Sequence, residues 1–243
     1  MIKNKNNQNS LSVFIEGEIV NLKVPDENFV ENSNWYNFLN SKRNTRFLEH
    51  GVYPNNLTKQ KEFYLNLQKD NRIVLLIFDK EENFLGIISL SFINLERKSA
   101  DISIVINMDN KIGYVNKNFL IALESIALMT EHGFEKLGLE RISATQVEDL
   151  YKWQNLMELT GFKIEGICRD KFIKGLEKKN CMMISSIKTD YLRLKKSRNK
   201  LWDGKDKMMQ RIKSLPKVNS YSMCLDFFKK LEKNYYNKIF LDK

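Results

Sequence analysis

Aromatic and arginine side chains gather in one N-terminal stretch of the sequence. The members of this group are Trp35, Tyr36, Arg43, Arg46, Phe47, His50 and Tyr53. An aromatic ring can stack against a sugar or a base, and guanidinium groups bind a diphosphate through paired hydrogen bonds, so the group suits a sugar nucleotide. The same composition also suits a peptide terminus, or an ordinary core with a charged rim. We take four of these residues as candidate substrate-binding residues: Trp35, Arg43, Arg46 and His50.

Sulfur and imidazole side chains are too few and too scattered to predict a metal site. The three cysteines, Cys168, Cys181 and Cys224, lie far apart and form no pair separated by two residues. Only His50 and His132 accompany them, whereas a structural zinc site needs four ligands at short spacings. We therefore expect no metal and reduced thiols, which favours a cytoplasmic protein.

The net charge of +10 is concentrated near the C-terminus. From residue 195 onward there are 14 Lys and Arg against five Asp and Glu, which gives +9. The remaining 194 residues carry 26 basic and 25 acidic side chains, which gives +1. A nearly neutral body argues against nucleic-acid binding by that part of the chain. Any contact with nucleic acid would belong to the basic tail.

The composition predicts a globular protein without a membrane span. Hydrophobic residues make up 42% and charged residues 29% of the 243 residues, which is ordinary for a folded domain. The longest apolar run, Ile73 to Phe78, is far shorter than the ~20 residues that a membrane helix needs. The first ten residues lack the apolar core of a secretory signal. The length favours one domain with an extension.

Hydrophobic periodicity outlines the elements that would position these residues. A strand is expected at 18–24, and helices at 29–39 and 59–69, the second with Thr58 as N-cap. A meander of three strands follows at 72–79, 84–94 and 100–107, the first apolar throughout as in a buried central strand. A long helix is expected at 118–137, with Gly138 as its C-cap. A strand at 140–146, a helix at 149–159 and strands at 161–166 and 181–188 complete the pattern.

The tail has a helical pattern of its own. Helices are expected at 206–215, before Pro216, and at 220–240, where apolar residues recur at helical spacing. Their apolar faces predict docking on the body or on a second subunit, as in a homodimer, in preference to a membrane surface. We divide the chain into a flexible arm (1–12), a central domain (13–194) and a basic helical extension (195–243).

Three short motifs accompany this order of elements: Phe134 to Ala144 (FEKLGLERISA), Gly161 to Arg169 (GFKIEGICR) and Leu85 to Leu90 (LGIISL). The order and the motifs resemble the GNAT acetyltransferases, in particular the branch that acetylates ribosomal-protein alanine. The first motif resembles that branch's link between the cofactor helix and the fifth strand, the second its "GF…EG…R" strand, and the third its third strand. The resemblance covers residues 18–192. It implies an α/β (α+β) fold with a central mixed, largely antiparallel sheet flanked by helices, plus the C-terminal extension.

The resemblance also implies acetyl-CoA as co-substrate, with its pyrophosphate held by backbone N–H groups at the start of the long helix. The family's glycine-rich loop is altered here, because residues 109–118 (DNKIGYVNKN) contain one glycine. The lysines of this loop could instead be solvated surface charges. The candidate cofactor-binding residues are Ile106, whose backbone N–H would be the oxyanion donor, and Lys111, Gly113, Val115, Asn116, Lys117 and Asn118.

Two candidate catalytic residues follow from the same resemblance. Asp101 occupies the place of a frequent glutamate in the family's fourth strand and would take the proton of the attacking amine through water. An exposed carboxylate paired with Arg97 or Lys98 is an equally good reading. Tyr151 could serve as acid toward the departing thiolate, although a packing role fits its position better.

The function implied is transfer of an acetyl group from acetyl-CoA to a primary amine by direct attack. The N-terminal aromatics and arginines favour a small-molecule acceptor such as an amino sugar linked to a nucleotide. The run WYNFLN (35–40) with TRFLEHG (45–51) resembles relatives that act in surface-polysaccharide synthesis, which the resemblance implies as the setting. Two alternatives are a protein N-terminal acetyltransferase of the ribosomal-alanine type, and a module of this fold that has lost catalysis and binds a ligand or partner.

Overall fold

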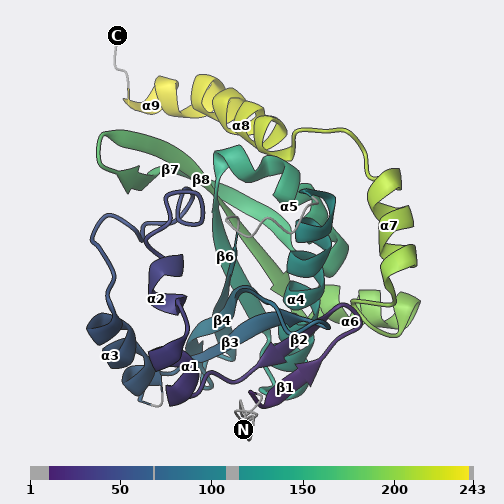
Figure 1. Cartoon of the computed structure of the whole chain (residues 1–243). Coiled ribbons are helices and arrows are strands. Elements are labelled where there is room, and N and C mark those ends of the chain that lie inside the picture. The colour runs from purple at the N-terminus through teal and green to yellow at the C-terminus, as the bar shows by residue number, and fades with distance from the viewer. Residues whose placement is uncertain (1–10, 68, 108–114, 241–243) are drawn as a thin grey trace, which may run out of the picture.

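The computed structural model describes residues 11–67, 69–107 and 115–240. Within these residues, eight strands form one sheet in the order β1-β2-β3-β4-β5-β6-β8-β7 (Figure 1). Every neighbouring pair is antiparallel except β5 and β6, which are parallel. This confirms the predicted mixed, largely antiparallel sheet. The strands are β1 (Val13–Glu16), β2 (Val20–Lys23), β3 (Ile73–Asp79), β4 (Phe84–Asn94), β5 (Ser99–Ile106), β6 (Arg141–Val147), β7 (Lys163–Lys174) and β8 (Glu177–Ile187).

Helices cover both faces of the sheet. On one face lies α4, whose side chains pack with those of β2, β4, β5 and β6 in the main core. On the other face α1 and α2 build a second, aromatic-rich core over β3. The helices are α1 (Glu27–Asn32), α2 (Trp35–Phe38), α3 (Leu57–Leu67), α4 (Val115–Glu135), α5 (Tyr151–Met157), α6 (Lys188–Arg198), α7 (Lys205–Ser214), α8 (Ser220–Leu231) and α9 (Asn237–Phe240), with a π-helical segment at Glu232–Tyr236 and 3₁₀ turns at Glu148–Leu150 and Glu158–Thr160.

The strand that reads as apolar throughout is buried on both faces, as expected. Leu75 and Ile77 of β3 belong to the main core, while Leu76 and Phe78 belong to the second core. Successive strand residues point to opposite faces, so a strand between two helical layers needs apolar residues at every position.

Two predictions about helix ends have different outcomes. Gly138, which follows α4, adopts a left-handed backbone with φ of 66°, as a C-cap glycine does. The N-cap predicted for α3 is wrong. Helix α3 begins at Leu57, and the side chain of Asn56 accepts a hydrogen bond from the Lys59 N–H at 2.9 Å. Asn and Thr both cap well, and the sequence offers them side by side.

The strands expected at 161–166 and 181–188 are longer than predicted. They form a hairpin of β7 and β8 that turns at Gly175, where φ is 62°. Charged residues interrupt the alternation of β7, and its register shifts between Ile164 and Gly166 and again between Cys168 and Phe172. A β-bulge breaks the two-residue period on which strand prediction rests.

The first part of the basic tail packs on the body. The predicted boundary at residue 194 falls within α6. Beyond it, Leu201, Trp202 and Met208 belong to the main core. The side chain of Glu18 accepts hydrogen bonds from Trp202 Nε1 and from the Lys205 N–H, both at 2.8 Å. These contacts hold the start of α7 against the turn between β1 and β2, in which Glu18 lies.

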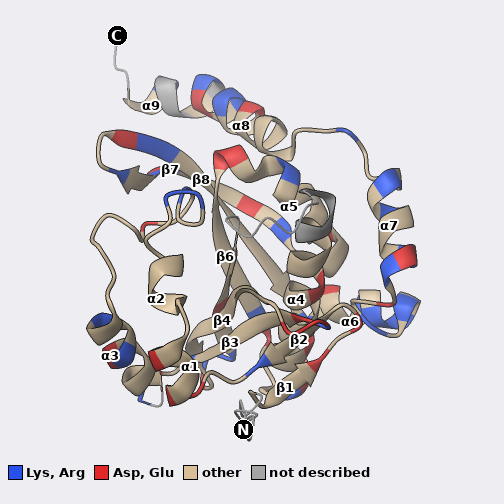
Figure 2. Cartoon of the chain, viewed as in Figure 1, with Lys and Arg blue, Asp and Glu red and all other residues tan. Residues whose placement is uncertain are grey.

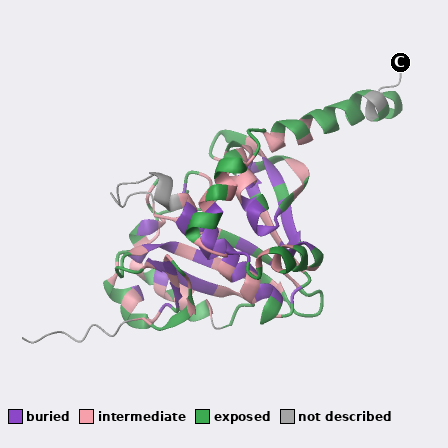
Figure 3. Cartoon of the chain, turned by 90° about the vertical axis from the view of Figure 1, so that its right-hand side faces the viewer, coloured by how far each residue is buried: buried purple, intermediate pink, exposed green. Residues whose placement is uncertain are grey.

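The second part of the tail contacts the body through the first turn of α8, where Tyr221 packs against the main core, and projects outward beyond that turn. Figure 3 shows the chain from α8 to α9 extending outward as an exposed helical segment. Lys and Arg residues occur along α6, α7 and α8 (Figure 2). The predicted helix at 220–240 is therefore present, with its middle turn π-helical. No helix among residues 11–67, 69–107 and 115–240 is long and apolar enough to cross a membrane.

Candidate functional site

Strands β5 and β6 separate after a short parallel contact and leave a cleft between them. Their pairing joins Ser99 to Arg141 and ends at Asp101 and Ser143. From there β5 continues through residues 102–106 and β6 through 144–147 along the two walls of a cavity of about 550 Å³. We call this cavity the splay cleft. Its third wall is the first half of α4, through Phe119, Ala122 and Ile126.

Beyond Asp101 the cleft-side backbone groups of β5 have no strand partner among the described residues. The Asn107 N–H donates to the Leu85 carbonyl of β4 at 2.7 Å. Because backbone groups alternate in direction along a strand, the N–H of Ile106 points to the opposite edge, which borders the splay cleft. Ile106 is half-buried and lines this cleft. The predicted role of the Ile106 N–H as donor to the acetyl oxygen stays a prediction.

The other predicted cofactor residues lie near the start of α4. Lys111 and Gly113 lie outside the described residues. Residues 115–118, which are Val115, Asn116, Lys117 and Asn118, form the first turn of α4. The N–H groups of a first helical turn have no partner within the helix, and they carry the positive end of the helix dipole. Their roles toward a cofactor remain predictions.

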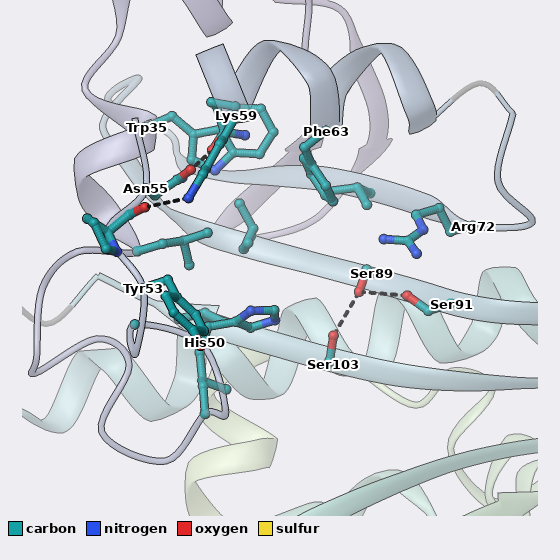
Figure 4. A pocket seen from close by; sticks show the side chains of 18 residues that line it. Trp35, His50, Tyr53, Asn55, Lys59, Phe63, Arg72, Ser89, Ser91 and Ser103 are labelled. Atoms are coloured by element: carbon teal, nitrogen blue, oxygen red, sulfur yellow. Dashed lines mark hydrogen bonds between the residues drawn. The ribbon is translucent and has the colours of Figure 1, made fainter. Parts of the chain in front are cut away.

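A second cavity lies on the face of the sheet that α2 and α3 cover. Its volume is about 420 Å³, and we call it the strand-face pocket (Figure 4). Trp35 of α2 and Phe63 of α3 form a wall, with their ring centroids 6.1 Å apart. The two cavities share three lining residues, Leu48, Ser103 and Val105, so they adjoin at the edge of β5.

Three serines form the polar floor of the strand-face pocket. The hydroxyl oxygens of Ser89 and Ser103 lie 2.8 Å apart, and the Ser91 hydroxyl donates to Ser89 at 3.5 Å (Figure 4). Alternation along β4 explains this arrangement, because Ile88 and Leu90 point into the main core and the serines point to the other face. The serines at alternating positions of 84–94 were the available signal in the sequence, and our sequence analysis did not use it.

The structure divides the predicted substrate residues between the two cavities. Trp35 and His50 line the strand-face pocket. Arg43 and Arg46 line the splay cleft instead, where the Arg46 guanidinium lies 5.0 Å from the ring centroid of Phe47. One stretch of sequence therefore contributes to both cavities, and the chain turns between them at residues 47–50.

Lys174, at the end of β7, holds this turn in place. Its Nζ donates to the carbonyl oxygens of Thr45 at 2.7 Å, Leu48 at 3.2 Å and His50 at 2.9 Å. The sequence could not indicate this role, because Lys174 stands more than 120 residues after its partners.

Asp101 is a residue of β5, two positions before Ser103, and it is not among the residues that line either cavity. Its register partners are Ser91 of β4 and Ser143 of β6. Partial burial raises the pKa of the Asp101 carboxyl, and the nearby charge of Arg141 opposes that rise. Arg141 in turn forms a bidentate ion pair with Glu165, one of whose contacts is 2.9 Å. An efficient general base at neutral pH has a pKa near 7, so a raised pKa makes the Asp101 carboxylate better suited to accept a proton. Its catalytic role remains a prediction.

Tyr151 packs with the main core and is not among the residues that line the splay cleft. Its neighbours Leu150 and Trp153 line the cleft instead. Gln146, which the sequence analysis did not single out, also lines the cleft. It is buried, and its Oε1 has no hydrogen-bond partner among the described residues. Buried acceptors are nearly always paired, so Gln146 marks a place for a ligand donor.

Comparison with known proteins gives a family and a fold. A family model described as "Acetyltransferase (GNAT) domain" matches residues 31–163. Among solved structures, spermidine N-acetyltransferase from Vibrio cholerae in complex with CoA and spermine is 18% identical, with a TM-score of 0.63, and the match covers 72% of this chain and 99% of that one. A chimera of the V. cholerae enzyme SpeG and hSSAT is 19% identical, with a TM-score of 0.61 and the same coverage. At such identities the likeness shows the fold alone. None of the curated proteins compared with the chain matches it.

Proposed function

Because the chain belongs to the GNAT acetyltransferase family, we propose that its splay cleft binds acetyl-CoA and its strand-face pocket binds the amine that is acetylated. Membership makes the chain an acetyl-CoA-dependent acyltransferase. The observation that carries the proposal is that two cavities on different sides of β5 meet at Leu48, Ser103 and Val105. A two-substrate transfer needs such a junction, because the reacting atoms must approach each other in one place.

The residues of the splay cleft fit acetyl-CoA. Its walls are mostly apolar, as the pantetheine chain requires, and the outward edge of β5 offers backbone groups to the pantetheine amides. The unpaired Oε1 of Gln146 could accept one of those amide hydrogens. At the other end the first turn of α4 offers N–H groups to phosphate oxygens.

The chain's own groups would then orient and deprotonate the amine. When bound, acetyl-CoA supplies the acetyl group as a thioester. The N–H of Ile106 is placed to stabilise negative charge on the acetyl oxygen. Asp101 would accept the amine proton through water. We assign no protein acid to the thiolate, since Tyr151 is not at the cleft and a thiolate of modest pKa leaves without one.

The lining of the strand-face pocket supports a hydroxylated small amine as acceptor. The floor of Ser89, Ser91 and Ser103 offers donors and acceptors to hydroxyl groups, and the rings of Trp35 and Phe63 offer faces for stacking. These features suit an amino sugar, including one linked to a nucleotide. The relatives named for spermidine differ from this chain too much to pass on their acceptor. The ribosomal-protein-alanine branch likewise remains a prediction.

The test is release of the CoA thiol from acetyl-CoA in the presence of a panel of amines. We expect turnover with amino sugars, and its loss in Ala144→Trp, which fills the splay cleft from β6. Ile173→Trp, at an exposed position of β7, is the control and should keep the activity of the parent. Absence of thiol release with every amine, or equal activity of the two variants, would contradict the proposal.

A further inference from the structure

We propose that the strand-face pocket selects an acceptor that carries an anionic group, a phosphate or a carboxylate, in addition to its amine. This inference rests on the proposed function, because it names the chemical class of the acceptor for the same pocket. The anionic group would lie at the end of the pocket that Trp35, Lys59 and Gln60 form, and the amine at the end that adjoins the splay cleft.

The charged side chains that line the pocket all have one sign. Among its described lining residues, the basic ones are His50, Lys59 and Arg72, and none is Asp or Glu. Arg72 is partly neutralised, because its Nε lies 3.2 Å from the carboxylate of Asp70. Lys59 has no carboxylate within ion-pair distance among the described residues, and its Nζ donates to the Pro54 carbonyl at 3.2 Å. The pocket therefore attracts anions and repels polycations.

Two buried donors at the same end lack an acceptor. Trp35 is 1% exposed and Gln60 is 2% exposed, and both line the pocket. Neither Trp35 Nε1 nor Gln60 Nε2 has a hydrogen-bond partner in the described part of the chain. The orientation of the Gln60 amide is fixed, because its Oε1 accepts from Asn55 Nδ2 at 3.0 Å. Both unpaired atoms are thus N–H groups.

Donors without acceptors indicate a ligand that accepts hydrogen bonds. Nearly all buried polar groups in proteins are paired, so two unpaired ones beside a cavity call for an oxygen supplied from outside. Phosphate and carboxylate oxygens are pure acceptors, and they form stronger hydrogen bonds than neutral oxygens do. Figure 4 shows Trp35, Lys59 and Asn55 together at one end of the pocket and Ser103 at the opposite side. This arrangement separates the anionic group from the amine.

An amine with an anionic group also satisfies the rest of the pocket. The serine floor lies toward the end that adjoins the splay cleft, because Ser103 lines both cavities, and it can bind hydroxyl groups near the amine. A spermidine-like polyamine has no acceptor for the two unpaired N–H groups. It would also bring positive charge toward Lys59 and Arg72.

The experiment compares four acceptors with the full chain and acetyl-CoA: a neutral amino sugar, its phosphate ester, its carboxylate analogue (an amino-uronic acid) and spermidine. We expect kcat/KM for at least one anionic acceptor to exceed that of the neutral amino sugar by tenfold or more. The preferred anion distinguishes phosphate from carboxylate. Equal or better use of the neutral amine or of spermidine would overturn the inference and leave acetyl transfer itself intact.

Two lysine variants on α3 test whether the preference for an anionic acceptor depends on Lys59. Lys59→Gln should remove most of the preference for the anionic acceptor. Lys61→Gln should keep it, because Lys61 is paired with Glu31 at 2.5 Å and does not line the pocket. Equal preferences in the two variants would refute the assignment of the anion to the Lys59 end.

A binding measurement separates this inference from the proposed function. Inorganic phosphate is titrated calorimetrically into the full chain saturated with CoA, so that any phosphate site for CoA is already filled. We expect binding that Lys59→Gln weakens at least fivefold and Lys61→Gln does not. Absence of thiol release with phosphate binding of this kind would refute the function alone. Turnover without such binding, and without anion preference, would refute the anion site alone.

Discussion

Replacement of Lys174 by methionine is expected to impair the acceptor pocket without unfolding the protein. The Lys174 ammonium holds the turn of residues 45–50 through three carbonyl oxygens, and two of those bonds are partly buried. This turn contributes Leu48 to both cavities and His50 to the strand-face pocket. Methionine keeps most of the apolar stem of lysine, so the change removes the donor and little packing.

The size of the effect follows from the number and burial of these bonds. A hydrogen bond to a charged group contributes about 1.5–3 kcal/mol, and exposed bonds contribute less. Because these bonds are at most partly buried, we count the three together as one fully buried bond. Their removal should then lower the free energy that stabilises the ordered turn by about 1.5–3 kcal/mol. Each 1.4 kcal/mol corresponds to a factor of ten. We therefore expect KM for the amine to rise roughly tenfold to a hundredfold.

The assay for Lys174→Met is steady-state thiol release at varied amine and at varied acetyl-CoA. KM for the amine should rise more than the dissociation constant of acetyl-CoA, because His50 lines only the strand-face pocket. Lys174→Arg should recover part of the loss. Lys178→Met, at an exposed position of the same hairpin, is the matched control. Kinetics of Lys174→Met equal to those of Lys178→Met would refute the assigned role.

Three further predictions concern the tail, the ion pair and the base. Trp202→Ala should lower the free energy of unfolding in urea by about 3–5 kcal/mol, whereas Phe227→Ala on the exposed α8 should leave it nearly unchanged. Hydrogen bonding to Arg141 lowers the pKa of Glu165, so its stabilising effect is present above pH ~4.5 and disappears as pH falls through the lowered pKa. The stability deficit of Glu165→Gln, measured by thermal unfolding against pH, should therefore shrink on acidification, and a deficit independent of pH would contradict this. Asp101→Asn should lower kcat by about 10²-fold or more and remove the acidic limb of the pH–rate profile; an unchanged profile would exclude it as the base.

The fold was largely predictable because its elements carry strong local patterns. The run in β3 and the periodicity of α4 report burial directly, and Gly138 marks a helix end by its left-handed backbone. The hairpin of β7 and β8 was only partly predictable, since its bulges interrupt the alternation that defines a strand.

The candidate site was less predictable because it depends on residues far apart in the sequence. Trp35 and His50 fell in one cavity and Arg43 and Arg46 in the other, and only the path of the chain decides this division. Lys174 contacts the turn of residues 45–50 from β7, the last strand in the sheet order, which the sequence places far downstream. Such contacts leave no periodic signal, whereas the alternating serines of β4 did and indicate a polar face in retrospect.

The central claim is that the splay cleft between β5 and β6 binds acetyl-CoA, and calorimetric titration of acetyl-CoA into the full chain tests it most directly. We predict micromolar binding, at least tenfold weaker in Ala144→Trp and severalfold weaker in Gln146→Leu, with Ile173→Trp unchanged and all unfolding midpoints checked in parallel. Absence of binding at millimolar acetyl-CoA, or equal affinity of the cleft variants and the control, would contradict the account.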